Sequence, residues 1–237
     1  MVEVTGHRGA AGYEPENTLR SFRKALEIGV DNVEFDVHLS RDGYLVVIHD
    51  VKVDRTTNAR GDVGSLTLDE LRKLDAGMGE RIPTLQEAID YLKDKAVLQI
   101  ELKGVGTEEP AVRLVEGNRV ERQVVFTSFD HTRVKRVKEL NPSLQTGVLI
   151  VGRPIDPVAV VKEARADGLH INYEAIDRAL VEDVHRGGLK VSVWNIDEAE
   201  DVDLMVDLGV DAIGSNKPDI VIARLRARGL RKFKAEL

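Results

Sequence analysis

Short runs of apolar and β-branched residues alternate with helical patterns along almost the whole chain. The runs lie at 2–6, 32–37, 97–103, 123–129, 144–151, 168–172, 189–194 and 210–215. Between most of them apolar residues recur at spacings of three and four, which is typical of helices that cover a sheet. These helical patterns lie at 18–28, 83–94, 130–140, 156–167, 175–187 and 197–209. Because no linker divides the chain, we expect a single α/β domain over 1–237, a TIM (β/α)8 barrel.

One run does not fit this alternation. Residues 44–50 (YLVVIHD) follow the second run after only the four residues SRDG. A parallel crossover needs about a dozen residues or more, so these runs are predicted to form an antiparallel hairpin. We expect a turn centred between Arg41 and Asp42, which pairs His49 with Glu34. The barrel then has an extra hairpin strand after its second strand, and 51–82 form a short insertion with one helix before the next barrel helix.

Charge and composition exclude several classes of protein. The formal net charge of −7 provides no positive field for broad nucleic-acid binding, so we expect a small-molecule substrate instead. The absence of cysteine excludes disulfides and thiolate metal sites. The first residues, MVEVTGHRGA, lack the basic start and apolar core of a signal peptide, and no run of about 18 apolar residues occurs. We therefore expect a cytoplasmic protein without a stable membrane anchor; nothing in the sequence predicts its oligomeric state.

Three carboxylates fall near the ends of two predicted strands. Side chains alternate along a strand, so Glu34 and Asp36 share one face, and Glu101 and Lys103 share a face of the next strand. Carboxylates inside a barrel are costly unless something neutralises them. The pattern predicts a hard-cation site for Mg²⁺ or Ca²⁺. The alternative is that these carboxylates only form ion pairs with Lys103 and Arg8.

Two histidines flank this acidic group in the sequence. His7 ends the first strand, and His49 ends the hairpin. Near neutral pH one imidazole can act as a base while the other acts as an acid. Arg8 and Lys103 provide positive charge suited to a phosphate. The pattern therefore predicts acid–base chemistry on a phosphorylated small molecule.

The motifs, taken in order, resemble those of the glycerophosphodiester phosphodiesterase family over nearly the whole chain. They are GHRG, PENTLRSF, VEFDVHLSRDGYLVVIHD, DRTTNARGDV, PTLQEAI, QIELK and VSVW. The resemblance implies a TIM barrel that hydrolyses glycerophosphodiesters to sn-glycerol 3-phosphate and an alcohol, with Mg²⁺, Ca²⁺ or Mn²⁺ as cofactor.

The resemblance also implies a role for each site residue. It makes His7 and His49 the catalytic acid–base pair. It implies that the metal is bound by Glu34, Asp36 and Glu101. It also implies that the substrate is bound by Arg8, Lys103 and Trp194, with Trp194 near the alcohol or the glycerol.

Two departures from the family pattern concern substrate detail. Gly214 and Ser215 stand where a bulky residue and threonine are common, and Asn195 follows Trp194 where threonine is frequent. We expect both departures to lie at the rim of the site. In PENT, Asn17 or Thr18 is predicted to cap the next helix, and bracing of the site by Asn17 is a second possibility.

Two rival functions remain open. One is a metal-dependent phosphodiesterase on the same barrel that acts on lysophospholipids or N-acyl ethanolamine lipids, which would need an apolar channel. The other is an inactive barrel that binds phosphorylated ligands, for which one of the candidate catalytic or metal-binding residues should be replaced. None of them is.

Overall fold

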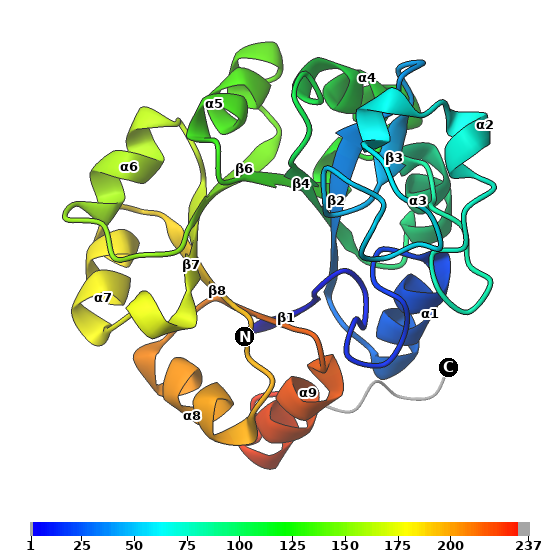
Figure 1. Cartoon of the computed structure of the whole chain (residues 1–237). Coiled ribbons are helices and arrows are strands. Elements are labelled where there is room, and N and C mark those ends of the chain that lie inside the picture. Colours follow the sequence, from blue (N-terminus) through cyan, green and yellow to red (C-terminus); the bar gives the residue numbers. More distant parts are fainter. Residues whose placement is uncertain (1, 232–237) are drawn as a thin grey trace.

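Residues 2–231, which the computed structural model describes, contain a closed barrel of eight parallel strands with helices around it (Figure 1). Strand β9 pairs with β1 and β1 with β2, which closes the sheet. Around the barrel the strands are β1 (Glu3–Gly6), β2 (Asn32–Leu39), β4 (Val97–Leu102), β5 (Val124–Ser128), β6 (Gln145–Ile150), β7 (Gly168–Asn172), β8 (Lys190–Trp194) and β9 (Ala212–Ser215). The predicted TIM barrel is confirmed.

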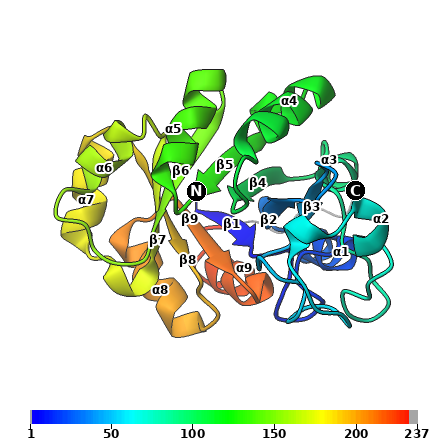
Figure 2. The same ribbon diagram turned by 45° about the horizontal axis from the view of Figure 1, so that its top comes forward.

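The helices lie on the outside of the strands, as Figure 2 shows from a second direction. Each buries an apolar stripe against the barrel, as Phe22 of α1 does against Phe35 of β2, with ring centroids 5.3 Å apart. In chain order they are α1 (Leu19–Ile28), α3 (Leu85–Leu92), α4 (Glu108–Asn118), α5 (His131–Leu140), α6 (Pro157–Glu163), α7 (Arg178–Arg186), α8 (Ala199–Leu208) and α9 (Pro218–Ala227).

Helix α4 was absent from the sequence-based prediction. Pro110 near its start and Gly117 near its end weaken the local helical signal. The helix tolerates Pro110 because backbone N–H groups in the first turn have no intrahelical partner to lose. Its apolar face, which includes Ala111, Val112 and Val115, is buried in the main core.

The hairpin is present, but its predicted register is wrong by one residue. Strand β3 (Leu45–Val47) pairs with β2 so that His38 faces Val46, and the pairing ends before His49. The turn has three residues instead of two, because Gly43 adopts a left-handed φ of 84° and lets the chain make one more residue of turn. A slip of one residue changes which face each side chain takes, so His49 is not opposite Glu34.

The segment 51–82 lies beside β3 and packs on a small apolar cluster of its own. That cluster includes Val53, Val63 and Leu71 together with Val46 of β3. The segment contains a 3-10 turn η1 (Val63–Ser65) and the helix α2 (Leu68–Leu71). A capping box between Thr67 and Glu70 begins α2.

The basic C-terminal segment is helical up to Ala227, in α9. Residues 232–237, which carry its last basic side chains, lie outside the described residues. Within 2–231, the longest apolar stretch of any helix is too short to cross a membrane.

Candidate active site

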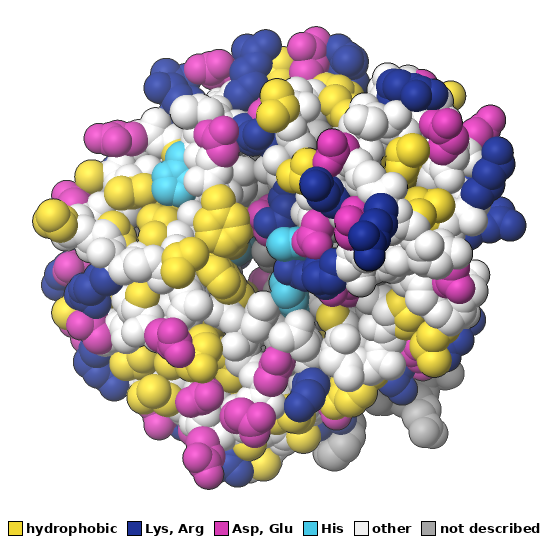
Figure 3. All heavy atoms as spheres, in the orientation of Figure 1, with side chains coloured by type: hydrophobic (Ala, Val, Ile, Leu, Met, Phe, Trp, Pro, Cys, Tyr) yellow, Lys and Arg dark blue, Asp and Glu magenta, His cyan; other side chains and the backbone are white. Residues whose placement is uncertain are grey.

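A cavity lies at the ends of the barrel strands and brings most of the predicted site residues together. Figure 3 shows this face hollowed near its centre, with charged and histidine side chains on the β2 side and hydrophobic ones on the β7 side. Of the candidate residues, those lining the cavity are His7, Arg8, Glu34, His49, Glu101, Lys103 and Trp194.

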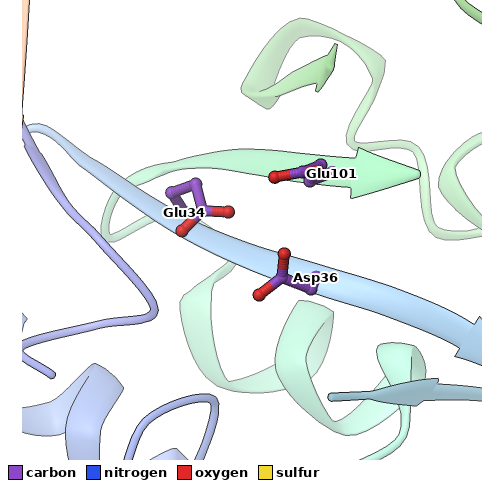
Figure 4. Close-up of side chains that lie close together, drawn as sticks. All are labelled: Glu34, Asp36 and Glu101. Carbon is purple, nitrogen blue, oxygen red and sulfur yellow. The ribbon is translucent and has the colours of Figure 1, made fainter. Parts of the chain in front are cut away.

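The carboxylate cluster, Glu34, Asp36 and Glu101, occupies two neighbouring strands. Asp36 of β2 is the register partner of Glu101 of β4, and Glu34 lies two residues before Asp36 on the same face. Figure 4 shows the three carboxylates turned toward one another. One oxygen from each lies within 4.8 Å of the others, and all three residues are buried. Alternation along adjacent parallel strands is what brings these side chains together.

Burial and mutual repulsion make this cluster unfavourable when fully charged. Burial, followed by the charges of Asp36 and Glu101, raises the pKa of Glu34 well above its usual range. Burial, followed by the charge of Asp36, raises the pKa of Glu101 to about 7. A divalent cation would remove this penalty, because it replaces repulsion with three attractive contacts.

Two cations partly balance the cluster through ion pairs, which by themselves do not decide between a metal site and ion pairs alone. Lys103 Nζ lies 2.8 Å from Glu101 and 3.8 Å from Asp36 Oδ1, and Arg8 Nε lies 3.4 Å from Asp36 Oδ2. The Arg8 backbone N–H also donates to Glu34 over 2.8 Å. Asp36 Oδ1 is nevertheless buried and accepts no hydrogen bond from the described residues. An unbonded carboxylate oxygen among three carboxylates fits a hard cation.

Asn17 braces Asp36, and Thr18 caps the helix. The Asn17 side chain donates to Asp36 Oδ2 over 2.8 Å and accepts from the Asp36 backbone N–H over 3.3 Å. Thr18 accepts from the Ser21 backbone N–H and so begins α1. Both alternatives considered for PENT are therefore realised, each by a different residue.

His7 is oriented by a chain of two polar residues that the sequence analysis missed. Its Nδ1–H donates to Asn216 Oδ1 over 2.7 Å, and the Asn216 amide in turn donates to Asp197 over 2.7 Å. The Asp197 contact turns the amide oxygen toward His7, so the ring proton lies on Nδ1 and Nε2 is the unprotonated ring nitrogen. Burial, followed by the charge of Arg8, lowers the pKa of His7 to about 4. The only sequence signal for Asp197 and Asn216 was their position, just after the last two strands.

His49 is oriented by a carboxylate instead of an amide. Its Nδ1–H donates to Asp50 over 2.5 Å, and its backbone carbonyl accepts from His38 Nε2 over 3.0 Å. Arg55 donates to Asp50 and, through both terminal nitrogens, to Glu16. Hydrogen bonding from Arg55 holds the pKa of Asp50 below its usual range.

Glu16 also accepts from Arg8 Nη1 over 2.9 Å. A continuous chain of hydrogen bonds therefore runs from His49 through Asp50, Arg55 and Glu16 to Arg8. We call the side of the cavity formed by Arg8, Lys103 and the carboxylate cluster the charged wall.

The opposite side, from β5 to β8, has no ionised residue among those that line the cavity, and we call it the neutral wall. Phe129 packs edge-on against Trp194, with ring centroids 5.6 Å apart and an interplanar angle of 88°. The remaining members of the neutral wall are Leu149, His170, Ser192 and Val193.

The expectation that both departures from the family pattern lie at the rim is wrong. Ser215 is fully buried and donates to Asp197 over 2.8 Å, so it supports the residue that orients Asn216. Gly214 lines the cavity beside the Trp194 side chain. Asn195 Nδ2 lies 3.5 Å from His7 Nε2. These residues belong to the site because they lie at the ends of β8 and β9, and β9 pairs with β1, the strand that His7 follows.

Comparison with known proteins identifies the family to which the chain is similar. A model described as the Glycerophosphoryl diester phosphodiesterase family matches residues 7–220. A glycerophosphodiester phosphodiesterase of Caldanaerobacter subterraneus subsp. tengcongensis is 39% identical over 239 residues, which covers 95% of this chain and 98% of that relative.

Two solved structures have the same fold. An Oleispira antarctica phosphodiesterase in complex with the product sn-glycerol-3-phosphate has a TM-score of 0.90 and 32% identity, covering 94% of this chain and 96% of that one. A glycerophosphodiester phosphodiesterase from Agrobacterium tumefaciens has a TM-score of 0.85 and 30% identity, covering 94% of this chain and 100% of that one. The range matched by the family begins at His7 and includes the whole carboxylate cluster.

Proposed function

The chain belongs to the glycerophosphoryl diester phosphodiesterase family, and we propose that it hydrolyses glycerophosphodiesters to sn-glycerol 3-phosphate and an alcohol. The observation that carries this proposal is the carboxylate cluster with His7 and His49 in the same cavity, each held at Nδ1. The product complex of the Oleispira antarctica structure supports the choice of product. We assign the activity to the barrel as one catalytic domain.

The carboxylate cluster would hold one divalent cation, Mg²⁺, Ca²⁺ or Mn²⁺. When bound, such an ion stabilises negative charge on the phosphoryl oxygens. Arg8 and Lys103 flank the cluster and contribute positive charge toward the same phosphate. Asn17 keeps Asp36 in place through its two hydrogen bonds.

The different Nδ1 partners support different roles for the two histidines. Asn216 is neutral and the His7 ring is buried, so His7 remains uncharged and its Nε2 can take a proton from the attacking oxygen. Asp50 is a carboxylate, which stabilises an imidazolium, so His49 can carry the proton that the leaving alcohol needs. The attacking oxygen is either water or the glycerol 2-hydroxyl, which would form a cyclic phosphate that water opens later.

A metal-titrated assay tests this proposal. The purified protein is treated with chelator, then supplied with Mg²⁺, Ca²⁺ or Mn²⁺, and sn-glycerol 3-phosphate release is measured over a panel of glycerophosphodiesters. Activity should disappear in chelator and return with at least one of these ions. Full activity in chelator, or no release with any ion, would overturn the proposal.

A lipid-like alcohol is a second candidate for part of the substrate, and exposed side chains favour it. Phe129, Val151 and Ile155 are large, exposed hydrophobic residues on neighbouring loops after β5 and β6. Of these three residues, Phe129 lines the cavity, and the sequence analysis did not identify this apolar surface. Comparing hydrolysis of glycerophosphocholine with that of a lysophospholipid distinguishes the two candidates: faster turnover of the lysophospholipid favours the lipid-like alcohol.

A further inference from the structure

His170 is a buried titratable residue of the neutral wall. It lies on β7, four strands from β2 in the order around the barrel, and so stands across the barrel from Glu34. Its side chain lines the same cavity as Glu34 and Trp194, and the residue is only 8% exposed.

The imidazole of His170 has no hydrogen bond or ion pair with any residue between 2 and 231. Burial alone lowers its pKa to about 4, so the ring is neutral near pH 7. A neutral imidazole has one N–H donor and one acceptor nitrogen. A buried polar group without partners is costly, and when it faces a cavity it indicates a ligand that supplies them.

The barrel makes room for this ring at a specific position. A Cβ on Gly147 of β6 would lie 2.3 Å from His170 Cδ2 and 2.4 Å from Nε2. Any other residue at 147 would therefore displace the imidazole. Beside it on β8, Ser192 is the register partner of His170 and also lines the cavity. Its hydroxyl makes no hydrogen bond within the described part of the chain. Two neutral polar groups thus face the cavity together.

We propose that His170, with Ser192 beside it, binds the terminal hydroxyl of the substrate's glycerol unit and so selects glycerol over other groups on the phosphate. This inference rests on the proposed function. The phosphate is held at the charged wall, and the terminal hydroxyl is the glycerol oxygen that reaches farthest from it. Leu149 and Trp194 supply apolar surface for the carbon chain in between. A neutral pair suits a hydroxyl, whereas an anion would favour Arg8 and Lys103.

The orientation of the substrate follows from the two ends of the cavity. The buried end, at His170, suits the glycerol unit that all glycerophosphodiesters share. The other end includes Phe129, which lines the cavity and is exposed, and this end suits an alcohol that varies. Specificity for glycerol is therefore separated in space from tolerance of the alcohol.

The test compares glycerophosphocholine with its analogue on propane-1,2-diol, which keeps the 2-hydroxyl and lacks the terminal one. The wild type should prefer glycerophosphocholine about 10-fold or more in kcat/KM. His170→Phe should lower kcat/KM for glycerophosphocholine to the level of the analogue, mainly through KM, and leave the analogue unchanged. His170→Gln, whose amide still donates and accepts, should keep part of the preference. His185→Phe, a change at an exposed histidine of α7, is the matched control and should alter neither substrate.

Gly147→Ala provides an independent variant, because it keeps the imidazole and displaces it. It should lose the same preference, and thermal unfolding reports whether each variant is folded. Equal losses on both substrates, or an unchanged preference in folded His170→Phe, would overturn the inference. Calorimetric binding of sn-glycerol 3-phosphate and of propane-1,2-diol 1-phosphate makes the same comparison without turnover. A protein that discriminates in binding but hydrolyses neither diester would refute the proposed function and leave the role of His170 supported; equal binding of the two would overturn that role.

Discussion

The two walls of the cavity differ in how far their polar atoms are already satisfied. On the charged wall, Arg8, Lys103 and the carboxylates bond mainly to one another and to neighbours such as Glu16 and Asn17. On the neutral wall, His170 and Trp194 Nε1 have no partners among residues 2–231. A wall whose charges are held by one another is preorganised for chemistry. A wall with unmet donors and acceptors is suited to recognising a ligand.

The largest expected effect comes from removing a carboxylate of the charged wall. Glu34→Gln should abolish detectable turnover, because one of the three carboxylates proposed to hold the metal becomes neutral. In chelator the same change should stabilise the fold, since burial and repulsion hold the pKa of Glu34 well above its usual range. A raised carboxyl pKa means that the folded protein binds the extra proton, so stability falls as pH rises above the unfolded value.

Thermal unfolding in chelator near pH 8 and calorimetric metal titration check this prediction. Glu182→Gln, at an exposed position of α7, is the matched control and should change neither result. Metal binding by Glu34→Gln that equals that of the wild type would refute the assignment.

Replacing the two histidines should give the next largest effect. The two variants should differ in which substrate rescues them, because His7 has an amide partner and His49 a carboxylate partner. His7→Ala and His49→Ala should each lower kcat by about 10²–10⁴-fold. A substrate with a p-nitrophenol leaving group needs no acid, so it should rescue His49→Ala and not His7→Ala. Steady-state kinetics on both substrates checks this, and the opposite pattern of rescue would exchange the two roles.

A smaller effect is expected from the chain that joins His49 to Arg8. Arg55→Ala removes the hydrogen bonds to Asp50 and Glu16, so both lose orientation. We expect kcat to fall about 10-fold with unchanged metal affinity. Arg55→Lys should recover only part of the lost kcat, because an ammonium cannot make the same forked contacts. Arg41→Ala, at an exposed arginine of the hairpin, is the control, and an equal loss there would show a general effect of the loop.

The last expected effect is on stability instead of turnover, and it separates the neutral wall from the charged one. Burial lowers the pKa of His170 from 6.5 to about 4, so between these values the unfolded chain binds a proton that the folded chain does not. Stability should therefore fall as pH drops from 6.5 to 4, by an amount on the order of 3 kcal/mol from this residue. Denaturant unfolding measures the free energy of unfolding across this pH range. It should fall less steeply in His170→Phe than in the wild type, and equal slopes in the two proteins would contradict the prediction.

Much of the fold could be predicted from local sequence patterns. The periods of two and of three to four residues distinguish strands from helices, and the brevity of SRDG requires a hairpin. The alternation within β2 and β4 likewise puts Glu34 with Asp36 and Glu101 with Lys103 on shared faces. These features depend on neighbours along the chain, and the sequence contains them directly.

Other features depended on tertiary structure. The hairpin register depended on the backbone conformation of Gly43, which spacing alone does not reveal. Asn216 orients His7 across 209 positions in the chain, because the barrel closes by pairing β9 with β1. His170 enters the cavity because Gly147 on the adjacent strand has no side chain. The sequence by itself determined which elements form and which residues can do chemistry; the closure of the barrel decided which of them meet, since those contacts join residues that are distant in the chain.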